Sequence, residues 1–347
     1  MHSIRSLIPA SLVSSVLLAA LAATSPASSA FEDTTSPGTA MGQAATRFVE
    51  VLDHSNRLKA VFKYDDPERL NWHFIPRERK GLGLWDLDGA ALEAAENLVR
   101  SGLSTAGYHK VLEVRSLEEV LYLFEGGEEE ARRQKRHPHK YYVSIFGTPG
   151  PKGLWGWRFE GHHLSLNFSV QDGRIVSTTP EFFGANPGLI DAGPGRSLRV
   201  LGAREDIARS ILKAAPEAQT AKIWLSKEAP GDIRGGGVIQ PVVADAEGVR
   251  YADMTPEQQQ LMKKLIAEYL AAVPATVVRE RMKMIEADGM DDIHFGWWGG
   301  SERNEPHHYV VQGSSFIIEY NNTQNEANHV HAIWRNLAGD FNVKVQK

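Results

Sequence analysis

The chain has 347 residues, of which 42% are hydrophobic and 23% are charged, the composition of a globular protein with a sizeable core. Its formal net charge of -5 excludes a general electrostatic basis for binding nucleic acid or an anionic membrane. It contains no cysteine, which excludes disulfides and a thiol nucleophile and leaves His, Asp and Glu as ligands for any metal ion.

The N-terminal segment has the pattern of a secretory signal peptide. A basic start with Arg5 precedes an apolar run from about Leu7 to Ala22, and small residues at Ser28 and Ala30 form a cleavage site. The apolar run is short for a bilayer span, and no stop-transfer segment follows it. We therefore expect residues 1–30 to be removed rather than kept as a membrane anchor, and the mature protein to be secreted or periplasmic.

After this segment we expect a flexible mature N-terminus at residues 31–43 and then one domain at residues 44–347. Apolar periodicity and capping signals predict helices at residues 44–62, 91–104, 116–126, 203–216, 255–273 and 275–289. Ser116 and Thr255 are the expected N-caps of the third and fifth of these helices.

Two groups of strands are expected, each following helices in the chain. Aromatic and β-branched residues bounded by turn residues predict strands at 141–147, 155–170, 173–183, 293–299, 307–313, 315–321 and 328–334. Because short turns join consecutive strands, we expect mainly antiparallel pairing. The order of elements indicates an α+β fold, with a largely antiparallel sheet carrying a His-rich face and with flanking helices.

The alternation of side chains along these strands places histidines on one face of the predicted sheet. In the last strand, His329 and His331 share a face whose reverse is apolar. His163 lies on the polar face of an earlier strand, and Glu319 and His308 occupy comparable positions on two others. If these strands are neighbours, the five side chains converge.

This set suits a transition-metal ion. An H-x-H pair on one strand places two imidazoles on the same side, and a third His with a carboxylate completes a site. We predict His163, His329 and His331 as ligands, Glu319 as fourth ligand or general base, and His308 as a reserve ligand. Zinc is favoured, with copper, iron and manganese as alternatives. The competing interpretation is that these histidines belong to an ordinary surface, because H-x-H on a strand is a weak motif.

Two arginines are further candidates for catalysis beside Glu319. Arg335 lies just beyond the histidine pair, and Arg158 alternates with aromatic residues on its strand. We expect both to bind an anionic group of the substrate or to stabilise developing negative charge. The aromatic residues form either a carbohydrate-stacking platform or, as is more usual on strands, part of the core. They are Trp155, Trp157, Phe159, Trp297 and Trp298.

Several longer motifs resemble a known family. They are "PRERKGL", "YYVSIFGTPG", "GWRFEGHHLSLNFSV", "TPEFFGANP" and "IEYNNTQNEANHVHAIWRN". Together they resemble, from about Trp72 to Phe341, a large bacterial and fungal family that is catalogued only as a domain of unknown function, number 3500 in its series. The resemblance implies one continuous domain and no particular reaction. It also implies that Gly161–His163, Ala185–Pro187 and His329–Arg335 belong to the distinctive stretches of the family.

The predicted function is that of an exported metal-dependent enzyme, a hydrolase in which a metal ion activates water to attack a small-molecule or carbohydrate substrate. The chain has no G-x-S-x-G nucleophile elbow. Two alternatives come from other classes: a non-catalytic metal- or carbohydrate-binding protein, and an iron or copper redox enzyme. Neither nucleic acid nor, after signal cleavage, a membrane is an expected partner.

Overall fold

The computed structural model describes residues 36–191, 193, 197–242 and 244–344. The expected signal peptide at residues 1–30 lies outside the described residues. The described ranges fall in one compact unit. Within them, no helix combines the length and the apolar character needed to cross a membrane.

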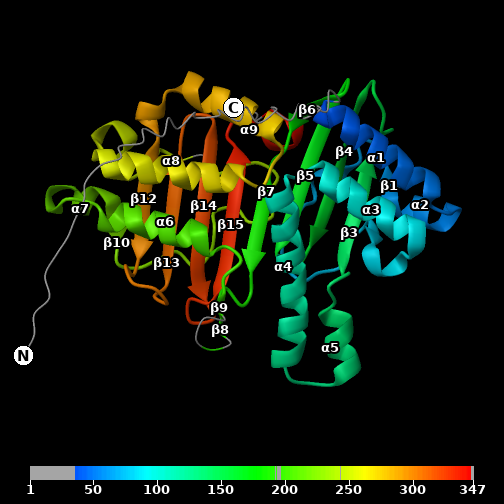
Figure 1. Ribbon diagram of the computed structural model, residues 1–347, viewed down its shortest axis with the longest axis horizontal. Coiled ribbons are helices and arrows are strands. Elements are labelled where there is room, and N and C mark those ends of the chain that lie inside the picture. Colours follow the sequence, from blue (N-terminus) through cyan, green and yellow to red (C-terminus); the bar gives the residue numbers. More distant parts are fainter. Residues whose placement is uncertain (1–35, 192, 194–196, 243, 345–347) are drawn as a thin grey trace, which may run out of the picture. The chain divides into compact units, whose positions relative to one another are not determined.

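A large, mostly antiparallel sheet runs through this unit (Figure 1). Its main path has the strand order β1-β3-β4-β5-β7-β15-β14-β13-β12-β10, while β2, β6 and β11 pair with β3, β5 and β12. Only the terminal pairs β1–β3 and β10–β12 are parallel among the described strands. The α+β class with a largely antiparallel sheet is therefore confirmed. The strands of this sheet are β1 (Val61–Phe62), β2 (Leu82–Gly83), β3 (Tyr141–Phe146), β4 (Leu154–Gly161), β5 (Leu164–Gln171), β6 (Arg174–Ser177), β7 (Glu181–Ala185), β10 (Trp224–Ser226), β11 (Val249–Arg250), β12 (His294–Gly299), β13 (His307–Gln312), β14 (Phe316–Gln324) and β15 (His329–Asn336), and β8 (Ile190–Asp191) pairs with β9 (Ser197–Leu198) separately.

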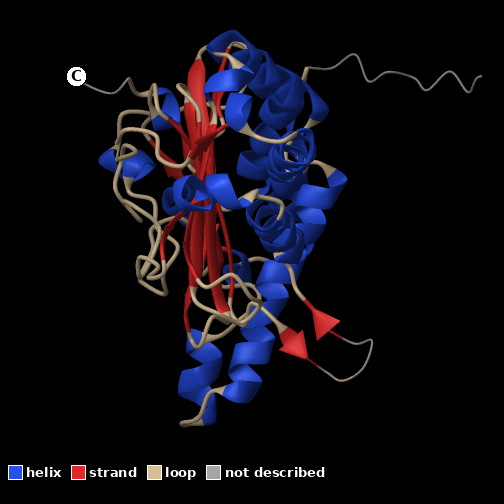
Figure 2. Ribbon diagram, turned by 90° about the vertical axis from the view of Figure 1, so that its left-hand side faces the viewer, coloured by secondary structure: helices blue, strands red, loops and turns tan. Residues whose placement is uncertain are grey.

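Most of the helices cover one face of this sheet, as the edge-on view in Figure 2 shows. The side chains of that face are apolar and pack with the helices into the main core, which includes Trp157 on β4, Tyr309 on β13 and Trp334 on β15. This burial provides most of the stability of the helices, because short helices are marginal on their own. The helices are α1 (Pro37–Val51), α2 (His54–Ala60), α3 (Gly89–Ser101), α4 (Thr105–Phe124), α5 (Glu129–Lys135), α6 (Gly202–Lys213), α7 (Glu217–Ile223), α8 (Pro256–Leu270) and α9 (Ala275–Asp288).

Long loops, rather than helices, cover much of the opposite face (Figure 2). A second, smaller core lies there and joins Trp72 and Phe74 of one loop to Ile233 of another. Phe182 on β7 and Ile333 on β15 supply the sheet side of this core. The loop-covered face therefore has its own buried layer, and the histidines of β15 point into that layer.

The topology brings the end of the chain into the middle of the sheet. The last strand, β15, pairs with β7 on one side and β14 on the other, and β7 pairs with β5. His163, in the turn before β5, therefore lies close to His329 and His331, which are distant from it in sequence. This placement creates the candidate site.

Two helix predictions need correction, and one cap is confirmed. The helix expected from residue 44 to 62 begins at Pro37 and ends at Val51, so residues 37–43 of the expected flexible N-terminus are helical. The helix expected to start at Ser116 is the second half of α4, which starts at Thr105, while the Ser116 hydroxyl donates to the Leu112 carbonyl one turn earlier. Serine suits both positions, so its type alone could not decide. Thr255 does cap α8 through a capping box.

Candidate metal centre

Three imidazole rings meet at the start of β15, on the loop-covered face. The Nε2 atoms of His163 and His329 are 2.7 Å apart, and those of His329 and His331 are 3.2 Å apart. One ligand atom from each of the three residues lies within 4.8 Å of the other two. Metal–nitrogen bonds of about 2.0–2.1 Å place two tetrahedral ligands about 3.3 Å apart, so the group fits a single shared ion.

Alternation along β15 positions two of the three rings. His329 and His331 project to the loop face, while Val330, Ala332 and Trp334 enter the main core on the other face. A register shift in the β14–β15 pairing lies at the first ligand, where His329 pairs with Gln324. Bulges of this kind re-aim side chains beside functional sites. The predicted H-x-H arrangement is therefore present.

The third ring, His163, comes from a strained turn rather than from a strand. Its φ of +61° is in the left-handed region, which is uncommon for residues other than glycine. Two backbone hydrogen bonds hold it there: its N–H donates to the Phe74 carbonyl at 2.8 Å, and its carbonyl accepts from Gly184 at 2.7 Å. Strain of this kind persists where the surroundings fix it, typically at functional sites.

Gly184 on β7 is required for His163 to occupy this position. A Cβ atom on Gly184 would lie 2.9 Å from the His163 ring and 2.9 Å from the backbone oxygen of Val330. Gly184 also pairs directly with His331 across the β7–β15 ladder. The absence of a side chain on Gly184 therefore lets the His163 ring approach the sheet beside His331.

Asp232, in the loop after β10, orients His331. The Asp232 Oδ1 atom lies 2.6 Å from His331 Nδ1 and also accepts from the backbone N–H of Ile233 at 2.7 Å. With its Nδ1 proton directed at the carboxylate, His331 presents the lone pair of Nε2 to the other two rings. Phe74 packs edge-on against the same imidazole, with 4.7 Å between ring centroids.

Burial keeps the ring nitrogens of two ligands, His163 and His329, unprotonated. Burial, followed by the neighbouring histidines, lowers the pKa of His163 well below its usual value. Burial and then His331 lower the pKa of His329 to about 3. For Asp232, burial opposes ionisation, but the hydrogen bonds from His331 and from the Ile233 N–H favour the ionised form, and the pKa of Asp232 is lowered. The neutral imidazoles of His163 and His329, near the ionised carboxylate of Asp232, are ready to bind a cation.

A second ring of polar residues stands behind His163. The His162 ring stacks on the His163 ring with centroids 3.8 Å apart, and its Nδ1 contacts the Glu118 carboxylate on α4 and lies 3.0 Å from Arg136. His162 is therefore a support for its neighbour rather than a ligand. A cavity of about 390 Å³ lies beside it, with Glu118, Lys135 and Lys140 among its lining residues.

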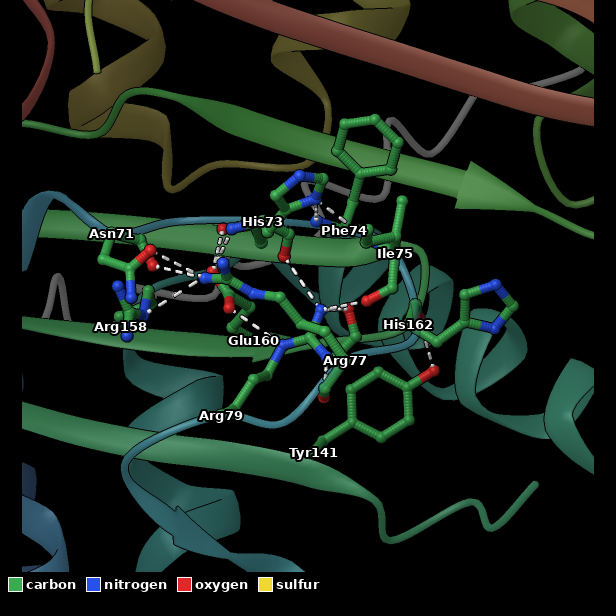
Figure 3. Close-up of polar contacts among 12 residues, drawn as sticks. Asn71, His73, Phe74, Ile75, Arg77, Arg79, Tyr141, Arg158, Glu160 and His162 are labelled. Carbon is green, nitrogen blue, oxygen red and sulfur yellow. Dashed lines mark hydrogen bonds and ion pairs between the residues drawn. The ribbon is translucent and has the colours of Figure 1, made fainter. Parts of the chain in front are cut away.

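The loop that carries Phe74 is held against β4 by the network in Figure 3. Arg79 forms an ion pair with Glu160 at 2.9 Å and also donates to the carbonyl oxygens of His73, Ile75 and Gly161. The other Glu160 oxygen accepts from the His73 N–H at 2.8 Å. These buried contacts fix the loop whose Phe74 carbonyl binds His163.

The two remaining predicted ligands lie apart from the three histidines. Glu319 accepts hydrogen bonds from the backbone and the side chain of Arg234, at 3.1 and 3.2 Å. His308 lies 3.6 Å from Glu319, and burial lowers its pKa to about 3. Both residues face the loop side, as alternation required, but neither belongs to the group of ligand atoms.

The two predicted catalytic arginines are buried in structural pairs. Arg158 forms an ion pair with Glu68 at 2.5 Å, and Arg335 forms one with Asp340 at 2.7 Å. Arg335 also donates to three loop carbonyls, including that of Gly235 at 3.2 Å. Their guanidinium groups anchor loops, and with exposed fractions of 2% and 1% neither is presented to a substrate.

Most of the aromatic residues considered as a carbohydrate platform belong to the core. Trp155, Trp157, Phe159 and Trp297 are buried among the helices, and Trp298 on β12 is half-buried on the other face. A stacking surface needs exposed rings. The core interpretation of the first four is therefore correct.

The family model described as "Protein of unknown function (DUF3500)" matches residues 34–343. The chain belongs to this family. The suspected resemblance is thus confirmed over nearly the whole chain, and all three histidines lie within the matched region. No curated protein and no solved structure matches. The chemistry of the site must therefore be argued from its own residues.

Sequence reasoning missed four residues that build the centre. Asp232 and Phe74 come from loops, where no periodic pattern indicates the direction of a side chain. Glu118 lies on a helix far from the sheet in sequence. Of these four residues, Gly184 alone had a sequence signal. It lies within the motif "TPEFFGANP", and a glycine inside a strand marks a place where another group approaches the backbone closely.

Proposed function

We propose that this DUF3500 protein is an exported, metal-dependent hydrolase whose ion is bound by His163, His329 and His331. The convergence of the three Nε2 atoms carries the proposal. Protons alone do not satisfy this arrangement, because a neutral imidazole has only one N–H and His331 directs its own at Asp232. One proton on His329 Nε2 can point at His163 or at His331 but not at both, which leaves one lone pair without a donor. A cation satisfies all three nitrogens.

The ligand set favours zinc. Zinc accepts three imidazoles in a tetrahedral site and keeps its fourth position open in catalytic centres. Copper and iron also accept imidazole, whereas manganese prefers oxygen ligands and fits this all-nitrogen set less well. When bound, such an ion lowers the pKa of a coordinated water and so supplies a nucleophile at neutral pH.

Residues around the proposed ion orient its ligands and can transfer protons. Asp232 fixes the tautomer and direction of His331 and increases its basicity as a ligand. Its side chain is 39% exposed, so the same carboxylate is also accessible as a proton acceptor. The cavity beside His162 has acidic and basic side chains in its lining, but neither the three ligands nor Asp232 line it, so it is not assigned to the substrate.

Elemental analysis of the purified mature protein tests the metal site. The wild-type protein should contain close to one equivalent of a transition metal, and His329→Ala/His331→Ala should lose it. His294→Ala is the matched control, because His294 lies on β12 outside the group and should leave the metal content unchanged. Absence of metal in the wild-type protein, with no gain after incubation with zinc, copper or iron salts, would overturn the proposal.

Turnover separates the hydrolase from the two other function classes. The metal-loaded protein should cleave at least one of a set of chromogenic esters, phosphoesters and glycosides, and a chelator should abolish that activity until zinc is restored. Stoichiometric zinc without turnover would favour a binding protein. A metal with visible absorption or a paramagnetic signal would favour a redox enzyme.

The predicted signal cleavage after Ala30 has its own test. Edman sequencing of the exported protein should give a sequence that starts at Phe31.

A further inference from the structure

A second cavity, of about 310 Å³, lies on the opposite face of the sheet from the histidines. It is lined by the start of α1, by β6, by α9 and by the last residues of β15, which lie near one another at the top of Figure 1. Trp334 lines it, and this residue is five positions along β15 from His329 and points to the other face. At about 3.3 Å per residue, the two sites are roughly 16 Å apart along the strand.

The walls of this cavity are largely apolar. Val277, Met284 and Ile285 come from α9, and Phe316 and Trp334 come from the sheet. Met284 is 43% exposed and therefore lies at the mouth, whereas Phe316 and Trp334 are buried behind it. Ligand pockets of about 300–1,000 Å³ typically combine such walls with a few polar groups.

Arg281 supplies the main polar group. It is 8% exposed, and one of its terminal nitrogens donates to Thr178 Oγ1 at 2.7 Å and to Glu181 at 2.8 Å. Its guanidinium lies 4.8 Å from the centroid of the Trp334 ring. The other terminal nitrogen, NH1, is buried and has no hydrogen-bond partner among the described residues.

A second buried donor accompanies Arg281 on the same helix. The Thr276 hydroxyl also has no partner among the residues that the structure describes. Leaving a buried donor unpaired costs about 1–3 kcal/mol, and more for a charged group. Both residues that carry these donors line the cavity. At the rim, Arg174 is exposed, while the acidic Glu280 is paired with Lys283 at 3.1 Å.

We propose that this cavity binds a small amphipathic carboxylate, with the apolar body against Trp334 and Met284 and the carboxylate on Arg281. A carboxylate has the oxygens to accept from the free NH1 of Arg281 and from Thr276, and charge-assisted hydrogen bonds of this type are strong. Arg174 adds positive charge at the entrance. The site is separate from the metal centre and does not depend on the proposed hydrolysis.

Isothermal titration with decanoate and with decanol tests this proposal on the mature protein. The two ligands share an alkyl chain and differ in the carboxylate. Decanoate should bind saturably, at one site per chain, and decanol should bind at least tenfold more weakly. No saturable binding of decanoate, or equal affinity for the two ligands, would overturn the proposal.

Two variants place the binding in this cavity. Met284→Trp fills the mouth and should weaken decanoate binding at least tenfold. Ala287→Trp, one turn further along α9, adds the same side chain at an exposed position outside the lining and should bind like the wild type. Wild-type affinity in Met284→Trp would show that the ligand binds elsewhere. Removing the Arg281 charge would leave the buried Glu181 carboxylate unpaired, so the charge is kept in the variant Arg281→Lys. Lysine lacks the second terminal N–H group of arginine, and this variant should therefore bind decanoate more weakly than the wild type.

Discussion

Asp232 and His331 form a hydrogen bond of 2.6 Å across 99 residues of sequence, and this contact turns a histidine on a strand into an oriented ligand. The carboxylate comes from a loop that lies over the sheet, whereas the imidazole belongs to the sheet itself. The same loop also packs into the second, smaller core through Ile233, the residue after Asp232. Packing of this loop and ligand orientation are therefore linked in one segment.

Replacement of Asp232 by Asn should weaken metal binding by about 10- to 100-fold, because an amide is a weaker acceptor for the His331 proton. Competition with a chromophoric chelator measures this change. Asp291→Asn is the control, because Asp291 is exposed and lies in another segment, the short 3-10 helix Met290–Asp292. If Asp232→Asn bound the metal as tightly as the control, the orienting role assigned to Asp232 would be wrong.

Gly184→Ala should lower metal affinity at least tenfold without removing any ligand. The added methyl would meet the His163 ring and the Val330 carbonyl, both at 2.9 Å, so His163 has to move. The overpacking should also cost about 1–3 kcal/mol of stability, measurable by urea unfolding. Gly126→Ala is the matched change, since nothing lies within 4 Å of its added Cβ. Retention of full metal affinity in Gly184→Ala would contradict the contact.

Acid should weaken the ion pair between Glu125 and Arg136, the arginine that also contacts His162 behind His163. Hydrogen bonds from Arg136 outweigh burial and lower the pKa of Glu125 from 4.5 to about 2. A depressed carboxyl pKa means that ionised Glu125 stabilises the fold above about pH 4.5, and that this contribution is lost as the pH falls towards 2. Glu125 is partly exposed, so the contribution is at most about 1 kcal/mol.

Urea unfolding of the wild type and of Glu125→Gln at pH 6 and pH 2.5 measures this effect. The wild type should be the more stable of the two at pH 6, and the difference should shrink at pH 2.5. A difference of the same size at both pH values would show that Glu125 is not held ionised by Arg136.

The sequence predicted the faces of the strands well, because alternation depends only on neighbouring residues. His329 and His331 project to one side of β15, and Val330 and Trp334 to the other, as expected. The same rule correctly placed Glu319 on the loop face. A face says nothing of distance along the strand, however: Glu319 pairs with Ile333, two positions past His331.

Alternation could not predict which loop residues reach the metal centre. Phe74 and Asp232 reach the centre because their loops pack on Ile333 and Phe182, and that packing depends on the whole sheet order. His163 was predicted on a strand but lies in the preceding turn with a left-handed backbone. It reaches the predicted group through contacts with Phe74 and Gly184, which a single strand pattern does not contain.

Glu319 gives a direct test of the ligand set, since the sequence favoured it as a ligand and the structure pairs it with Arg234. Burial raises the pKa of Glu319 more than Arg234 lowers it. Glu319→Gln keeps the shape and one acceptor oxygen. Its metal content and chelator resistance should stay within twofold of the wild type, while His329→Ala, measured in parallel, should lose the ion. Loss of metal in Glu319→Gln, with an unchanged circular dichroism spectrum, would make Glu319 the fourth ligand and would require the Arg234 loop to move when metal binds.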